Sequence, residues 1–488
     1  MDGIKLLAMG FSAALTGPHL LSALLGTLLG FVAGVMPGVS LLALMAMLLP
    51  FVRSLDALSV LILLAAVYCG AQHGSSTAAM LTRMQGERRS GRAMLAFAGL
   101  GSLFAACVGT AFIAAVAWLL APLSARLGAV EYCSLMVLIL AGTVALGSGS
   151  VIKAVAMIVL GLLLGQVNRD VMSGTPRFSL GIPQLTNGLS FMALALGVFG
   201  IGGAMAHLGH PMARRKALTG SAEGPTPKGE DFRHVWPSVL RGTALGSLLG
   251  MLPGAATLLA SFASGSLEKQ LARDPGIASD KGALQEATAS TSAHSAGART
   301  SLTPLLILGI PPNAAMALMM GAMTPKDAQP GLHVMGSTPG LFWALMASLW
   351  IGSLILFGLK LLLIAGGGRL LARPYRLLFP ATVVFCCVGA YALKQDGFDV
   401  YMVAFFALLG YVLRKLGCEP ASLLLGFIVG PLMEEKLRGA LLSSEGSWSV
   451  FVTRPLSAGL LVAAAALVIA VMLPTLRSRR QVIFQDKD

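Results

Sequence analysis

The chain has 488 residues, of which 56% are hydrophobic and only 11% charged, and its mean hydropathy is +0.80. This composition excludes an ordinary water-soluble domain and predicts an integral membrane protein built from long apolar helices. The formal net charge of +14 is typical of basic loops on the cytoplasmic side of a membrane. No basic stretch is interleaved with base-stacking aromatic residues, so we expect a lipid bilayer and no nucleic acid as partner.

Apolar runs of helical length follow one another along the whole chain. They lie near residues 18–36, 38–52, 55–81, 93–121, 131–147, 149–165, 189–206, 239–264, 301–323, 337–365, 377–393, 398–413, 420–433 and 450–473. A straight crossing needs about 20 residues, so the short runs 38–52, 149–165 and 420–433 are expected to be half-helices or re-entrant hairpins. We predict an all-α polytopic membrane protein with about eleven to thirteen helices.

Polar segments divide the apolar runs and indicate how the chain is organised. The main interruptions are 166–188, 207–238 and 265–300, and the middle one combines Pro, Gly, Ser and mixed charge as a surface linker does. Basic residues concentrate in segments predicted to be cytoplasmic, namely 83–92, 214–241, 369–376, 414–415 and 477–480. The predicted units are a first transmembrane repeat region 1–206, a linker 207–238, a second transmembrane repeat region 239–434, and a carboxyl-terminal helix with a basic tail 435–488.

Two Pro-Gly interruptions, GVMPGVS at 34–40 and GMLPGAA at 250–256, break apolar runs that would otherwise continue as helices. Both fit the pattern GxxxGxxPG, through Gly30, Gly34, Pro37 and Gly38 in one copy and Gly246, Gly250, Pro253 and Gly254 in the other. Matched breaks in two hydrophobic halves predict discontinuous helices that meet near the bilayer midplane in two related, inverted repeats. A plain proline kink with small-residue packing between helices remains the alternative.

Four ordered segments resemble the large membrane subunit of the bacterial tripartite tricarboxylate transporters. They are GFVAGVMPGVS, LLPFVRSLDALSVLILLAAVYCGAQHGSSTAAML, GMLPGAATLLASFASGSLEKQL and PLLILGIPPNAAMALMMGA, and the resemblance covers residues 20 to 430. It implies a secondary transporter of the bacterial inner (cytoplasmic) membrane that imports carboxylates by symport with a coupling cation, either sodium or a proton. It also implies two partners, a small membrane subunit and a periplasmic substrate-binding protein.

Several motif positions match the family and others depart from it. The Pro-Gly elements match, and Gly70, Ala71, Gly74 and Ser75 fit the small-residue segment of the family. Its first Asn-Ile-Pro-Gly turn is replaced by residues 83–86, and its second survives in part as Gly309, Ile310, Pro311 and Pro312. An acid and an Asn pair common in the family are replaced by Thr291, His294 and Ser295, and Arg299 stands where Gly is usual. These departures leave the substrate open between tricarboxylates and other small organic anions.

Candidate substrate-binding residues surround the breaks and the polar segment 286–303. They are Pro37, Gly38, Ser40, Gly74, Ser75, Ser76, Pro253, Gly254, Thr257, His294, Ser295, Arg299, Gly309 and Pro311. Backbone N–H groups at a helix start and nearby hydroxyls can bind an anion, and an arginine can hold a carboxylate through two parallel hydrogen bonds. The alternative for 286–303, which holds eight hydroxyl residues, is a solvated loop or helix start.

Absent motifs narrow the function further. The sequence contains no GxxxxGK[ST] loop, no HExxH and no GxSxG, and its acidic residues avoid the interior of the long apolar runs. We therefore predict no enzyme, no cofactor and no carboxylate proton relay, and the sequence leaves the metal question open. A membrane enzyme using His294 and Arg299 at a surface site, and an uncoupled anion channel, remain as alternatives to a coupled carrier.

Overall fold

The computed structural model describes most of the chain. The described residues are 3–36, 40–84, 91–124, 127–146, 150–170, 173–186, 188–208, 229–254, 256–271, 279–323, 339–364, 378–394 and 397–472. Pro37 and Gly38 lie outside these ranges, so their predicted roles are not placed. Over the described residues the chain is helical, with only an isolated bridge between Arg169 and Pro176, which confirms the predicted all-α class.

The first half of the chain alternates long helices with short ones, as the spacing of its apolar runs predicts. Its elements are α1 Gly3–Ala14, α2 Gly17–Val35, α3 Leu41–Val52, α4 Ala57–Met84, α5 Gly91–Ser124, α6 Ala129–Leu146, α7 Val151–Gly165, the 3-10 turn η1 Pro183–Leu185, α8 Phe191–Ala195, the π-helical η2 Leu196–Ile201 and α9 Gly202–Leu208. Pro18 stands in the first turn of α2, where the N–H that proline lacks would have no helical partner in any case.

The second half begins with α10, which starts inside the segment predicted to be a linker. Its elements are α10 Gly229–Leu249, α11 Ala256–Leu271, α12 Ser279–Thr300, the π-helical η3 Pro304–Leu308, α13 Ala314–Met323, α15 Pro339–Ile364, α16 Leu378–Lys394, α17 Gly397–Lys415, α18 Pro420–Ser443, α19 Val450–Thr453 and α20 Pro455–Met472. The expected polar interruption at 265–300 is instead mostly helical, since α11 and α12 occupy most of it.

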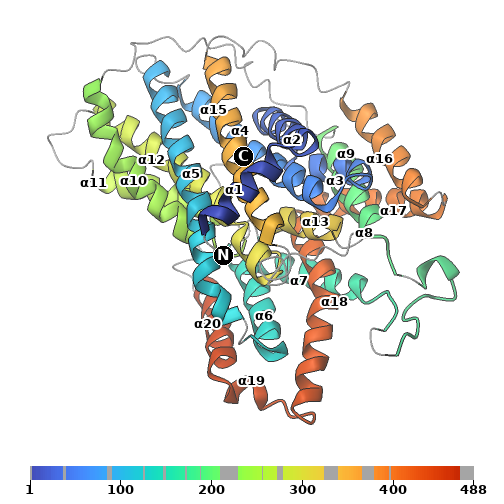
Figure 1. The fold of residues 1–488 in the computed structure, drawn as a ribbon. Coiled ribbons are helices and arrows are strands. Elements are labelled where there is room, and N and C mark those ends of the chain that lie inside the picture. Colours follow the sequence, from blue (N-terminus) through green and yellow to red (C-terminus); the bar gives the residue numbers. More distant parts are fainter. Residues whose placement is uncertain are drawn as a thin grey trace.

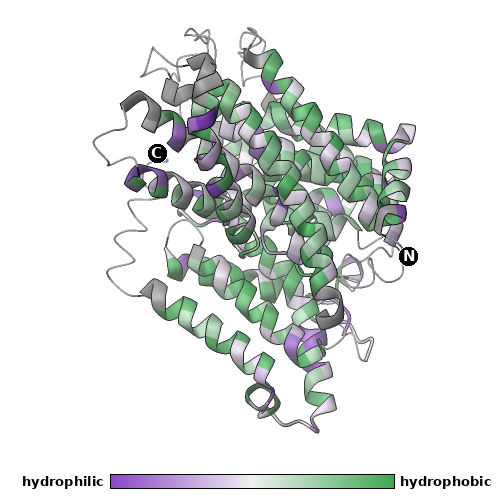
Figure 2. Cartoon of the chain, turned by 60° about the vertical axis from the view of Figure 1, so that its left-hand side comes forward, coloured by the Kyte–Doolittle hydropathy of each residue, from purple (hydrophilic) through white to green (hydrophobic). Residues whose placement is uncertain are grey.

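Five of the described helices are long and apolar enough to cross a membrane. These spans are Gly17–Val35, Ala57–Met80, Met94–Leu119, Pro339–Leu362 and Gly397–Lys415. Shorter apolar helices include α3 and α7, in agreement with the short runs predicted there. Figure 2 shows hydrophobic residues along most of the helices, and Figure 1 shows α6, α18, α19 and α20 extending away from the main bundle. The total number of crossings remains a prediction.

Helices α2 and α4 pack closely through glycines. Methyl groups placed on three glycines of α2 would collide with backbone carbonyls of α4, in the pairs Gly26 with Leu63, Gly30 with Val67, and Gly34 with Ala71. In these contact pairs the residue numbers increase along both helices, so α2 and α4 run parallel. Helix α3 connects the end of α2 to the start of α4. Helix α2 ends at Val35, beside the middle of α4, which fits the predicted break at 34–40.

Helices α10 and α12 pack in the same way. The corresponding close approaches are Gly242 with Ala289, Gly246 with Ala293, and Gly250 with Gly297. These two helices also run parallel, with α11 returning between them. Helix α10 ends at Leu249 and α11 begins at Ala256, so the second predicted break is confirmed as a real interruption of the helix.

One end of the bundle gathers the end of α4 and the starts of α5, α10 and α12. Their buried apolar contacts include Met80, Met94, Val235 and Leu284. The end of α15 joins them, because a methyl group on Gly99 would lie 3.7 Å from the ring of Phe357. The basic segments 83–92, 214–241 and 369–376 of the sequence adjoin these helix ends, so we call this the basic end of the bundle.

Candidate functional site

Helix α12 is polar in sequence and buried in the structure. Every residue from 291 to 300 is buried, so the solvated-loop alternative for this segment is wrong. Thr288 and Thr291 satisfy their hydroxyls by donating to the carbonyls of Leu284 and Ala287, one turn earlier. Because a buried polar group without a partner costs free energy, the remaining polar side chains of α12 are the candidates for a binding site.

Arg299 is the largest fully buried side chain, with 1% of its surface exposed. Its Nη2 donates to Ser353 Oγ of α15 at 2.9 Å, and Ser353 in turn donates to the carbonyl of Leu349. Its Nε has no hydrogen-bond partner, and none of the described carboxylates forms an ion pair with it. A buried cation with no acid and an unused donor is costly unless an anion binds there.

Two serines extend the unsatisfied polar surface around Arg299. Ser292 and Ser295 are fully buried, and neither hydroxyl has a partner. Their spacing from Arg299 places all three side chains on one face of α12. Thr27 of α2 has an unpartnered hydroxyl as well, and it lies beside Gly352, the neighbour of Ser353. Unused hydroxyl and guanidinium donors therefore occur on one face of α12 and, at Thr27, beside the α15 residue that precedes Ser353.

Two further nitrogen-containing side chains are buried nearby. His73 of α4 pairs through Nδ1 with the carbonyl of Cys69 at 3.0 Å, and it lies within electrostatic reach of Arg299 and Lys360. Lys360 of α15 is 6% exposed and donates from Nζ to Ser102 Oγ at 3.0 Å. We did not predict a role for Lys360. The signal was nevertheless present, because it is the single charged residue in the apolar span Pro339–Leu362.

Helices α4 and α12 are joined by two polar contacts. Tyr68 and Ser301 share a hydrogen bond of 2.9 Å between their hydroxyls, and Gln72 Oε1 lies 3.0 Å from His294 Nε2. The later residue of α4, Gln72, contacts the earlier residue of the second helix, His294, so α4 and α12 run antiparallel. His294 thus belongs to the polar contact between the two halves of the chain.

The second Pro-Gly break contacts another irregular segment. Gly254 has a φ of +91° and donates its N–H to the carbonyl of Pro312 at 3.0 Å. Gly309, with a φ of +68°, ends η3 in the left-handed conformation that glycine adopts most readily. Pro253 packs against Gly142 of α6, and Pro311 is buried. The structure therefore brings the predicted residues of the second break together with the 309–312 turn.

The remaining predicted residues lie in ordinary packing or capping positions. Gly74 allows α4 to approach the backbone of Phe31 and Gly34 in α2, as the packing alternative expects. Ser75 is exposed and donates to the carbonyl of Gln72, a local bond within its own helix. Ser40 precedes α3 without a side-chain capping bond, Ser76 is partly buried, and Thr257 is buried at the start of α11 beside Gly297. No described contact joins these four hydroxyl residues to Arg299.

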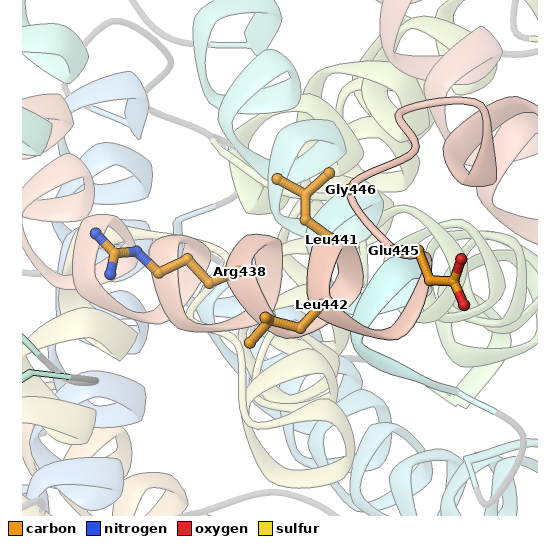
Figure 3. Close-up of a pocket in the computed structure, with 5 residues that line it drawn as sticks. All are labelled: Arg438, Leu441, Leu442, Glu445 and Gly446. Atoms are coloured by element: carbon orange, nitrogen blue, oxygen red, sulfur yellow. The ribbon is translucent and has the colours of Figure 1, made fainter.

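A surface hollow at the end of α18 lies apart from the predicted site residues. A hollow of about 420 Å³ is lined by Arg438, Leu441, Leu442, Glu445 and Gly446 at the end of α18. Figure 3 shows the two charged side chains directed to opposite ends of it, with leucines between them. It lies far along the chain from every predicted site residue. Across the described ranges, no group of three His, Cys, Asp or Glu residues could hold a metal ion.

An all-helical protein in which five described helices are long and apolar enough to cross a membrane has the features of a polytopic membrane protein. Comparison with known proteins then assigns the family. Residues 20–425 match the Tripartite tricarboxylate transporter TctA family, and the chain belongs to that family. This finding confirms the resemblance drawn from the sequence motifs.

Two relatives from Agrobacterium vitis are similar along the chain. One is an uncharacterized 52.8 kDa protein of the TAR-I ttuC' 3' region, 44% identical over 503 residues that cover all of both chains. The other is an uncharacterized protein of the TAR-II ttuC' 3' region, 48% identical over 243 residues that cover half of this chain and all of the relative. No solved structure matches the chain.

Proposed function

We propose that this protein is the membrane-embedded carrier of a transport system for a small organic anion, a di- or tricarboxylate, with Arg299 as the carboxylate anchor. Family membership implies a component of tricarboxylate transport. The observation that carries the proposal is the buried guanidinium of Arg299, which bonds Ser353, pairs with no described carboxylate and leaves Nε unused. A carboxylate that accepts bonds from Nε and Nη would supply the missing negative charge.

The mechanism we propose is alternating access by two inverted repeats. The glycine contacts of α2 with α4 recur, one for one, between α10 and α12, and in each pair one helix connects the two along the chain. The antiparallel contact of α4 with α12 gives the two units opposite directions in the membrane. Rocking one such unit against the other would expose a central site to each side in turn.

Orientation and coupling are part of the same proposal. The basic end of the bundle faces the cytoplasm of a bacterial inner membrane, because short basic segments remain on that side. A coupling cation, sodium or a proton, would drive import. Backbone carbonyls and hydroxyls at the helix breaks can hold a cation without a carboxylate. The small membrane subunit and the periplasmic substrate-binding protein would complete the system, as the family match supports.

Uptake into sealed proteoliposomes tests the proposal. The purified protein, with a small membrane subunit and a substrate-binding protein of the same family system, is given [14C]citrate or [14C]succinate with and without an imposed sodium or proton gradient. Accumulation above equilibrium that disappears when one gradient is removed is the expected result, and it names the coupling ion. Equilibration without accumulation indicates an uncoupled channel. Chemical conversion of the substrate indicates an enzyme, and either outcome overturns the carrier mechanism.

A further inference from the structure

One face of α12 continues from Arg299 toward the basic end of the bundle. Ser295 and Ser292 follow Arg299 on this face, and both hydroxyls are fully buried without partners. The seven residue steps from 299 back to 292 span about 10 Å of helix axis. Two buried hydroxyls without hydrogen-bond partners on the same helix face are unusual in a packed bundle. Each such group costs free energy when it is removed from water.

Helix α5 packs along this face of α12. A methyl group on Gly109 would lie 3.3 Å from Arg299 Cβ, and one on Gly101 would lie 2.7 Å from Ser292 Oγ. Ser102, the residue after Gly101, accepts the hydrogen bond from Lys360 Nζ. The ammonium group of Lys360 therefore lies at the Ser292 level of the bundle, nearer the basic end than Arg299.

Lys360 does not reach toward water as a lysine close to a helix end usually does. Its side chain is directed inward to Ser102 and is almost fully buried. Of the ion pairs formed by described residues, none includes Lys360. His73 lies within electrostatic reach of both Lys360 and Arg299, so these three basic side chains belong to one buried region. Burying a second basic side chain there without an acid has no structural benefit that these contacts explain.

We infer that Lys360 is a second anion-binding residue, at which the carboxylate substrate is held between the central Arg299 and the basic end of the bundle. This inference rests on the proposed transport function. The hydroxyls of Ser295 and Ser292 would donate to the carboxylate as it passes from one cation to the other. Two separated cations hold the anion in steps, so neither has to bind it so tightly that release becomes slow.

The test compares a maximal uptake rate with an equilibrium affinity. Proteoliposome uptake of [14C]citrate and [14C]succinate is measured for wild type, Lys360→Met and Lys360→Arg, and binding of the same compounds is measured on the solubilised proteins. Lys360→Met should lower the maximal rate about tenfold while the Kd at Arg299 changes less than about threefold, and Lys360→Arg should restore most of the rate. Lys153→Met is the matched control, because Lys153 is exposed and bonds the carbonyl of Leu416.

The outcomes separate this inference from the proposed function. If wild type moves neither compound with its partners present, the proposed function fails and the inference fails with it. If wild type is active and Lys360→Met stays within about twofold of it, only the inference is overturned. A Lys360→Arg variant as slow as Lys360→Met overturns it too, because charge would then not matter. Should Lys360→Met fail to fold, Ser292→Val must slow uptake without changing the Kd, and normal uptake in that variant overturns the route.

Discussion

Arg299 of α12 donates a hydrogen bond of 2.9 Å to Ser353 of α15, a residue 54 positions further along the chain. This contact fixes one Nη of the guanidinium and leaves Nε unpaired. Ser353 is itself held by its bond to Leu349. The arginine is thus oriented by a neutral partner, and its charge remains available to an anion.

Removing the guanidinium should weaken carboxylate binding. We expect Arg299→Ala to raise the Kd for the transported carboxylate at least a hundredfold, and Arg299→Lys to raise it about tenfold because an ammonium cannot form two parallel bonds. Isothermal titration or scintillation proximity binding on purified protein measures this. Arg233→Ala is the control, since Arg233 is exposed on α10. Unchanged affinity in Arg299→Ala would remove this residue from the site.

The close approach of α10 to α12 should not tolerate a side chain. Gly246→Val places a branched side chain against the backbone of Ala293, and we expect it to lower the free energy of unfolding by about 1–3 kcal/mol or more. Thermal unfolding in detergent measures the loss. Gly358→Val on α15 is matched, because no atom lies within 4 Å of a methyl group placed on Gly358. Equal melting temperatures for the two variants would contradict the packing described here.

Gly254 should matter for transport beyond its backbone conformation. Its φ of +91° and its N–H bond to Pro312 place it at the second break. Gly254→Leu and Gly174→Leu should both be destabilised by about 1–2 kcal/mol, since each glycine has a positive φ. Only Gly254→Leu should lose uptake, because a methyl group on Gly174 meets open space. Full uptake by folded Gly254→Leu would favour a simple kink.

A charge network holds the irregular segment 173–186 against α18. Arg177 lies 2.7 Å from Asp170 and 2.8 Å from Glu434, and Arg438 joins the same two acids. The hydrogen bond that Arg177 donates to Glu434 raises the pKa of Arg177, so the guanidinium stays charged at any physiological pH. We expect Arg177→Ala to speed amide exchange in 173–186 about tenfold, a loss of about 1.4 kcal/mol.

Hydrogen–deuterium exchange with mass spectrometry gives that rate directly. Lys436→Ala is the control, because Lys436 pairs with Glu435 at the protein surface and exposed pairs contribute little. If exchange in 173–186 stays the same after Arg177→Ala, the backbone bonds from Asp170 to Thr175 and from Arg177 to Asn168 hold the segment by themselves.

The sequence was sufficient for the membrane class, the family, the helical secondary structure and the break at 250–256. These features are local: apolar runs long enough to span a bilayer, and a Pro-Gly pair that ends a helix. The prediction of a polar interruption at 265–300 was wrong, because α11 and α12 occupy most of this segment. The polarity of a segment does not by itself distinguish a solvated loop from a buried polar helix. The family motifs singled out Arg299 and His294, and both lie in the buried polar region.

Tertiary structure decided how these residues are used. The packing of distant helices brings Ser353, Tyr68, Gln72 and Lys360 into the polar region. It also places Gly74 at a close helix contact, while Ser75 bonds within its own helix. The direction of α4 against α12 was likewise set by contacts between the two halves of the chain. Sequence records where a helix starts and stops, but the burial of a charge depends on which segments surround it, and long-range packing determines that.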